Sequence, residues 1–245
     1  MFRPIFAVAA ALAVAAPVFA QPFDADEKAA IDAQIRAYIL ENPEILMEAM
    51  RVLEDRQQAR AAENDRALIS SLGDELIDDG YSHVAGNPEG DVTVVEFADY
   101  RCPYCKRAHE AVKALLSADE NVRLVIKEFP ILGPDSTYAA RAAMAAQLQG
   151  PELYEAFNDA MMSHQGDLDE RTVMRIAETS GLDVEAIRRD MDRPEIADNI
   201  RRTYSLARRL EINGTPGFVI GDRIVRGFVE YDQLREMVEN AREQG

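Results

Sequence analysis

Two cysteines, Cys102 and Cys105, are the residues in this sequence best suited to chemistry. They are the two cysteines of a 245-residue chain, and they stand three positions apart. The apolar run 92–97 precedes them, and a segment with helical periodicity follows. Two thiols at this spacing can close into a small disulfide ring or reopen it. The pattern therefore predicts a redox-active dithiol at a strand-to-helix junction.

The residues between the cysteines predict which sulfur is the reactive one. Pro103 suits the first position of a helix, because its missing N–H would have no partner there and its φ is already helical. Cys102 is then the N-cap, where the free N–H groups of Tyr104 and Cys105 and the positive end of the helix dipole favour a thiolate. We expect Cys105, one turn further on, to be the buried resolving thiol.

Other uses of the cysteine pair receive less support from the sequence. Structural zinc needs four ligands, and the three histidines do not stand at zinc-finger spacing. Haem attachment needs histidine after the second cysteine, where the chain has Lys106. A Cu(I) ion held by the two thiolates stays open as an alternative, and so does an inert disulfide, although so small a loop constrains the unfolded chain little. For the redox interpretation we expect no metal and no cofactor.

The first 20 residues resemble a secretory signal. Arg3 precedes an apolar run over residues 5–16, which is too short to span a bilayer. Small residues at Val18 and Ala20 predict cleavage after Ala20. An uncleaved anchor is the alternative. Export to an oxidising compartment, the periplasm, suits a CxxC pair, and the net charge of −17 argues against a nucleic-acid partner.

Residues 21–72 are predicted to form a helical arm that precedes the strand-rich part. Asp24 and Glu27 have capping-box spacing, and Asn42-Pro43 ends one helix and starts another. Apolar side chains recur along both helices, and residues 54–66 are almost wholly polar, as in a solvated connector or hinge. An apolar face on such an arm suggests a homo-oligomer formed through residues 24–53. The alternative is that the arm folds back on its own domain.

The rest of the chain alternates strands and helices. Strand 92–97, the helix from Pro103 and strand 122–129 form a predicted parallel crossover over residues 81–134. Residues 135–211 have helical patterns broken at four glycine- or proline-containing positions. Residues 212–245 return to two strands, with Gly221-Asp222 as the turn, and a last helix. The class is α/β, with a helical insertion between the two parts.

Two charged residues interrupt the apolar strands, Glu96 and Lys127. An unpaired ion would be costly inside a sheet. Either both lie at strand ends and reach solvent, or Glu96 lies beneath the motif and takes the proton of Cys105, with Lys127 as its electrostatic partner.

Three segments resemble the DsbA family of thioredoxin-fold oxidoreductases. They are residues 96–106, 127–136 and 213–218, and the likeness covers about residues 81–243. The resemblance implies that Cys102 is the nucleophile, that Thr215 and Pro216 form a cis-proline loop, and that Glu96 and Lys127 are the family's buried acid and nearby lysine. The Thr215 backbone would then pair with an extended substrate strand.

The sequence departs from the best-known DsbA members in two places. Pro103 and Tyr104 give a dipeptide typical of glutaredoxins, and the arm looks like that of ScsC and related oligomeric members with isomerase or reductase activity. The resemblance implies unfolded or disulfide-bearing protein substrates and a membrane redox partner, either DsbB-like or DsbD/ScsB-like. The arm favours an oligomeric isomerase slightly over a monomeric dithiol oxidase.

Overall fold

The computed structural model describes residues 24–244. They divide into two compact units, of which the first ends at Gln57 and the second begins at Gln58. Helix α2 (Glu44–Ile77) runs through this boundary without a break, so the polar stretch 54–66 is one part of a continuous helix. Among the helices formed by residues 24–244, none combines the length and the apolar character that a membrane span requires.

The first unit contains α1 (Ala25–Glu41) and the beginning of α2. The predicted capping box is present, because the Asp24 carboxylate accepts from the Glu27 N–H at 2.8 Å and the Glu27 carboxylate accepts from the Asp24 N–H at 3.0 Å. Asn42 ends α1 as its C-cap. No residue of α1 is buried. Residues 24–57 of these helices are therefore held by local capping and hydrogen bonds, with no apolar core of their own.

The second unit is built on a five-stranded sheet with the order β1-β3-β2-β4-β5. Strands β2 and β3 are parallel and are joined through helix α3 (Pro103–Ala118), as the strand-helix-strand pattern predicts. The remaining pairs are antiparallel. The strands are β1 (His83–Gly86), β2 (Val92–Ala98), β3 (Val122–Glu128), β4 (Gly217–Ile220) and β5 (Arg223–Arg226).

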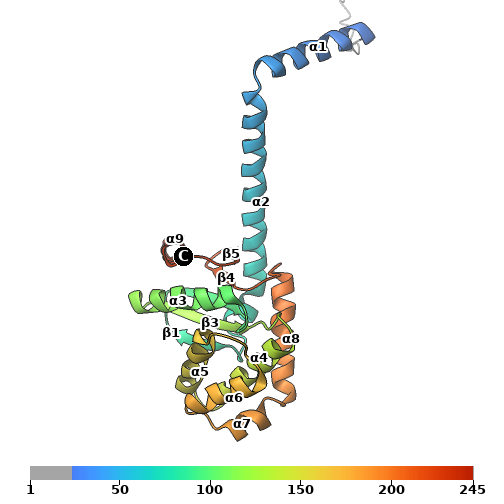
Figure 1. Ribbon diagram of the computed structural model, residues 1–245. Helices are drawn as coiled ribbons and strands as arrows, with labels where there is room; N and C mark the ends of the chain where they lie inside the picture. Colours follow the sequence, from blue (N-terminus) through green and yellow to red (C-terminus); the bar gives the residue numbers. More distant parts are fainter. Residues whose placement is uncertain (1–23, 245) are drawn as a thin grey trace, which may run out of the picture. The chain divides into compact units, whose positions relative to one another are not determined.

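Helices cover both faces of this sheet (Figure 1). On one face, α3 (Pro103–Ala118) and α9 (Tyr231–Gln244) pack on alternate residues of the strands. On the other face lie the end of α2 and the end of α8 (Pro194–Arg209). Leu72 and Leu76 of α2 are almost fully buried there, and each contributes roughly 1.5–3 kcal/mol by leaving water. The final turns of α2 therefore belong to the second unit, whereas the sequence pattern extends the arm to residue 72.

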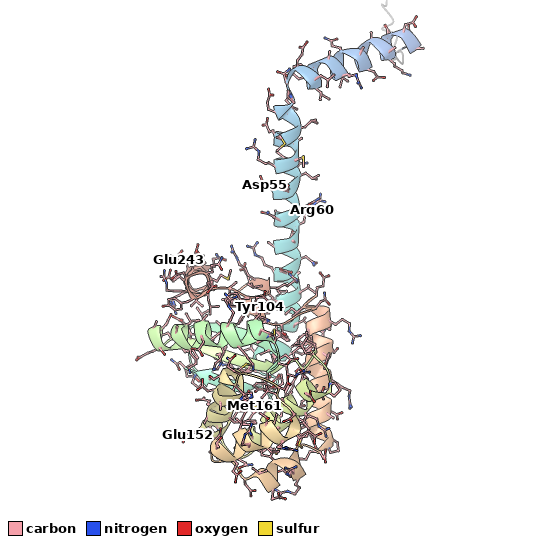
Figure 2. All side chains as sticks on the ribbon, viewed as in Figure 1. Asp55, Arg60, Tyr104, Glu152, Met161 and Glu243 are labelled. Atoms are coloured by element: carbon pink, nitrogen blue, oxygen red, sulfur yellow. The ribbon has the colours of Figure 1, made fainter. Side chains whose placement is uncertain are left out.

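Five helices follow β3 and form the insertion that the sequence predicts. The breaks between them fall at the expected glycine and proline positions, and Asp169 and Asp183 cap two of the helices with their carboxylates. Met161 lies in the interior of this insertion (Figure 2). Besides α8, the helices are α4 (Pro134–Gln147), α5 (Pro151–Ser163), α6 (Glu170–Thr179) and α7 (Val184–Asp190).

Candidate active site

The two cysteines lie where strand β2 gives way to helix α3. Cys102 is the N-cap of α3 with extended backbone, and Pro103 is in the first turn. Cys102 exposes 5% of its surface, and Cys105, one turn further on, exposes none. Both are free thiols. Both sulfurs are therefore enclosed, and Cys102 is the slightly more exposed of the two.

A loop from the far end of the sequence covers the outer sulfur. The Thr215–Pro216 peptide bond is cis, as the resemblance implies, and Cys102 Sγ lies 3.2 Å from the Thr215 carbonyl oxygen, to which the thiol donates when it is protonated. Gly217 follows and begins β4. A Cβ atom at this position would lie 2.6 Å from Cγ2 of Ile212, so only glycine allows the loop to pack this closely against the chain that leads into it.

The two thiols have opposite acidities. The contact with Cys105 is the largest influence lowering the pKa of Cys102 to about 5, and hydrogen bonds from Thr215 and from the N–H groups of Cys105 and Tyr104 act in the same direction against the effect of burial. Burial raises the pKa of Cys105 far above its ordinary value, and the Glu96 carboxyl raises it further. At neutral pH the outer sulfur is therefore a thiolate and the inner sulfur holds its proton.

Glu96 lies inside β2 on the face that α3 covers. Its carboxyl is buried, burial raises its pKa to about 7, and Oε1 has no hydrogen-bond partner among the described residues. Glu96 also lines a cavity of about 260 Å³ together with His109 and Asp159, whose side chains are 2.8 Å apart. A buried carboxyl with a pKa near neutrality can give and take a proton at the pH at which thiols react.

Lys127 does not partner Glu96. In the parallel pairing of β2 and β3, Lys127 is opposite Phe97, the residue next to Glu96. Successive side chains of a strand point to opposite faces, so the two charges face different sides of the sheet. The Lys127 ammonium donates instead to Asp79 Oδ2 at 2.5 Å and to the Glu75 carbonyl at 2.9 Å. The expected pairing was wrong because inter-strand register, unlike residue spacing, is not visible in one sequence.

Asp99 is a site residue that the sequence patterns did not single out. Its Oδ1 accepts from the Arg101 N–H and from the Ser136 hydroxyl, both at 2.8 Å. Its Oδ2 accepts from the N–H groups of Ile131 and Leu132. The Asp99 N–H itself lies 3.5 Å from the Cys105 sulfur. One buried carboxylate thus ties the loop that contains the dithiol to the loop after β3. The signal in the sequence is an aspartate directly after a buried strand, where Asx turns form.

A second buried carboxyl, Glu128, was also missed. The hydroxyl groups of Tyr100 and Tyr154 lie 2.8 and 3.1 Å from its Oε1, and the Tyr100 hydroxyl also lies 3.0 Å from the Asn158 amide oxygen. Burial raises the pKa of Glu128 to about 8. The network joins Tyr100 to helix α5. It therefore holds the helical insertion against the loop that contains the dithiol.

Tyr104, the second residue between the cysteines, points outward. It exposes 55% of its surface, and its ring centroid lies 6.2 Å from that of Phe228. The Arg107 guanidinium lies 4.3 Å from the Phe228 ring centroid. These three side chains form an aromatic and cationic edge beside the dithiol. Tyr104 is therefore a surface residue and not a part of the core.

A thioredoxin-like sheet with a helical insertion, a CxxC helix start and a cis-proline loop defines a class of dithiol proteins. The DSBA-like thioredoxin domain model matches residues 93–239, and the chain belongs to that family. The model for the copper resistance protein ScsC N-terminal domain matches residues 27–60. The resemblance inferred from the sequence motifs is thereby confirmed, for the catalytic unit and for the arm.

Two solved structures agree with this assignment. A thioredoxin-like oxidoreductase from Silicibacter pomeroyi is 53% identical, covers 69% of this chain and 97% of its own, and superimposes with a TM-score of 0.67. Proteus mirabilis ScsC in a transitional conformation is 28% identical over 91% of this chain and 98% of its own, with a TM-score of 0.68. The Na(+)/H(+) antiporter NhaA 3 of Salinispora tropica is 34% identical over 167 residues, and the match spans 67% of this chain but only 25% of the antiporter.

Proposed function

We propose that the protein is an exported thiol:disulfide oxidoreductase that acts on disulfide-bearing or misoxidised proteins. The observation that carries the proposal is the asymmetry of the dithiol. An outer cysteine with a pKa of about 5 stands beside a cis-proline loop, and an inner cysteine is buried and protonated. A thiolate is the nucleophile in disulfide exchange, and a covered, protonated neighbour prevents the pair from reacting with two substrates at once.

The exchange begins with attack of the Cys102 thiolate on one sulfur of a substrate disulfide. A Cys102–substrate disulfide forms, the substrate S–S bond breaks, and the second substrate sulfur leaves as a thiolate. That thiolate can attack another disulfide of the substrate, and the thiolate released there attacks the Cys102–substrate disulfide, so that Cys102 leaves as a thiolate and the substrate is isomerised with no net oxidation. Alternatively, Cys105 attacks Cys102, so that the substrate leaves as a dithiol and the enzyme holds the Cys102–Cys105 disulfide. In the oxidase direction the same steps run backwards.

Glu96 is proposed to accept the proton of Cys105 when that thiol attacks. Cys105 must lose its proton inside the protein, where burial opposes the thiolate. The Glu96 carboxylate lies under the motif, has a free oxygen and has a pKa of about 7, which is close to the pH at which a general base works best. Lys127 takes no part in this step, because it faces the other side of the sheet.

Substrate chains are proposed to bind along the cis-proline loop. Thr215 contacts the Cys102 sulfur through its carbonyl oxygen, so a backbone segment alongside Thr215 is next to the reacting atom. Hydrogen bonds between main chains do not depend on the side chains of the extended segment, so this kind of binding does not require a particular substrate sequence. It therefore suits an enzyme that acts on many unfolded proteins.

The arm is proposed to assemble copies of the chain, which favours the isomerase role. Apolar side chains of its two helices are in solvent, where they gain nothing by themselves. An assembled isomerase can keep a misfolded substrate near more than one dithiol, whereas a monomeric oxidase needs one encounter. The exposed side chains are Ile31, Ile35, Tyr38, Leu40, Leu46, Met47, Met50, Val52 and Leu53.

We further propose that the chain works in the periplasm after cleavage behind Ala20, a position outside the described residues, and that a DsbB-like or DsbD/ScsB-like membrane protein resets the dithiol. The Cys102–Cys105 disulfide left by each reductive cycle needs a source of electrons, and an oxidising compartment supplies none in solution.

Refolding of a scrambled disulfide protein, run beside sedimentation of the same sample, tests the function. We expect the reduced full-length protein to restore the native substrate as an oligomer, and Cys102→Ser to restore none while sedimenting unchanged. Stoichiometric Cu(I) uptake by the two thiolates without refolding activity would instead support the copper-binding alternative. Efficient oxidation of reduced substrate by a monomer would support the dithiol oxidase.

A further inference from the structure

A groove of about 560 Å³ opens beside the reactive cysteine, and its lining is rich in positive charge. Arg101 and Pro103, the two neighbours of Cys102 in the chain, form one end, and Lys106 and Arg107 continue it along α3. The opposite wall is the end of α5, where Met162 gives a buried apolar floor. The groove therefore runs from the two residues that flank Cys102 across the first two turns of α3 to the helical insertion, and Cys102 itself does not line it.

Lys106 has no carboxylate partner among residues 24–244. Its ammonium donates to the carbonyl oxygen of His164 at 2.5 Å, and partial burial lowers its pKa. A carbonyl satisfies one of the three N–H donors and neutralises no charge. A cation that is partly desolvated and unpaired gains more from an incoming anion than a fully solvated one does.

Arg101 is held but not fully neutralised. Its guanidinium donates to the Leu132 carbonyl at 2.8 Å and lies 3.7 Å from Asp135, a distance too long for a direct hydrogen bond. Arg107 is better paired, with Glu230 at 2.9 Å. Glu110 is the one acidic residue in the lining of the groove. The lining itself holds three cations and this one acid, and Lys106 is the cation among them that has no carboxylate partner within residues 24–244. The chain as a whole has a net charge of −17.

The local charge, not the net charge, acts on a group that enters the groove. At physiological ionic strength, exposed charges more than about 8 Å apart are largely screened. A substrate tethered at Cys102 would place residues a few positions from its own cysteine within that distance of Arg101 and Lys106. Acidic residues elsewhere on the surface repel an acidic substrate only weakly at that range.

We propose that this basic groove binds the carboxylate side chains of substrate polypeptides next to the cysteine that reacts with Cys102, and so makes acidic flanking sequences the preferred substrates. The inference rests on the proposed oxidoreductase function and adds a substrate preference to it. The occupant is a polypeptide and not a free anion, because the groove begins at the two neighbours of the reacting cysteine and has an apolar floor. Arg101 suits bidentate binding of a carboxylate, and Lys106 supplies a point charge.

Three matched peptide disulfides test the preference on the reduced full-length protein. Each peptide has one cysteine in a mixed disulfide with thionitrobenzoate, flanked on both sides by glutamates, glutamines or lysines. Attack by Cys102 releases the coloured thiolate, so the initial rate is read directly. At 20 mM salt we expect the glutamate peptide to react roughly tenfold faster than the lysine peptide, and the ratio to fall at 0.5 M salt.

Substitutions in the groove locate the effect. Arg101→Gln and Lys106→Gln should each lower the glutamate-to-lysine rate ratio, and the glutamine peptide corrects for any change in the reactivity of Cys102 itself. The matched control is Arg208→Gln, which removes one exposed positive charge from α8, on the sheet face opposite α3.

Two results would overturn the inference while leaving the oxidoreductase function intact. One is equal rates for all three peptides at every salt concentration. The other is a glutamate preference that persists in the Arg101→Gln, Lys106→Gln double variant, since the selecting charge would then be elsewhere. Absence of reaction with any peptide would instead contradict the proposed function itself.

Discussion

Each of the two units has residues in unusual surroundings: the first unit exposes large apolar side chains, whereas the second buries carboxyl groups. In the first unit, large apolar side chains such as Leu40 and Leu46 are exposed, and α1 buries nothing. In the second unit, carboxyl groups are buried, with Glu96, Asp99 and Glu128 each less than 8% exposed. Exposed apolar groups and buried charges are both costly by themselves.

The difference indicates two kinds of function. Exposed apolar surface gains free energy only when another surface covers it, so the first unit is suited to association. Burial raises the pKa values of Glu96 and Glu128, so the second unit is suited to moving protons near the two sulfur atoms. If each property belongs to its own unit, a change in one should leave the other unaffected, and four experiments follow from this comparison.

The acidity of Cys102 should give the largest effect. A pKa of about 5 in place of 9 raises the thiolate fraction at pH 6 roughly 1,000-fold. We expect iodoacetamide to alkylate the reduced protein with a rate midpoint near pH 5, mapped to Cys102 by mass spectrometry. The same midpoint is expected after the arm is altered. A midpoint near that of a free cysteine would remove the basis for an activated nucleophile.

Charges placed in the arm should abolish assembly without changing this midpoint. Ile35→Glu combined with Leu46→Glu removes two exposed apolar side chains, each able to contribute roughly 1.5–3 kcal/mol if it is covered in an oligomer. Sedimentation velocity is expected to show an oligomer for the mature protein and a monomer for the double variant. Gln57→Glu is the control and should assemble normally, because Gln57 is an exposed polar residue of α2, the helix that contains Leu46. A monomeric mature protein would contradict the association role.

Glu96→Gln should give the smallest effect, and it should depend on pH. Burial raises the Glu96 pKa from 4.5 to about 7, so the folded state binds this proton more tightly than the unfolded state does. The wild type therefore loses stability as pH rises from 4.5 to 7, by roughly 3 kcal/mol, and the glutamine variant lacks this loss. Chemical denaturation at pH 5 and pH 8 measures it, with the exposed Glu243→Gln as the control.

The same variant examines the proton step. Without a carboxylate beneath the motif, formation of the Cys105 thiolate should slow at least roughly tenfold, which can be read as the rate at which Cys105 resolves a preformed Cys102 mixed disulfide. The rate should also lose its dependence on a group with a pKa near 7. An unchanged pH profile would reject Glu96 as the acceptor.

Local features of the site were predictable from residue order. The N-cap position of Cys102, the first-turn Pro103 and the capping box of α1 each depend on a few neighbouring residues. The cis bond at Pro216 followed from the family resemblance, since an X-Pro bond is usually trans. The sequence pattern did not predict strand β1, because the strand has only four residues and is stabilised by antiparallel pairing with β3.

By itself, the sequence determined that Cys102 stands at a helix start, that Cys105 lies one turn further in, and that a helical arm precedes them. Tertiary structure alone decided which polar and charged groups contact one another. Lys127 faces Asp79 and not Glu96, and Asp99 reaches across to Ile131, because strand register and loop packing set those distances. The reason is physical: helix starts and caps are fixed by interactions within a few residues, whereas side-chain partners across a sheet depend on how distant segments pair.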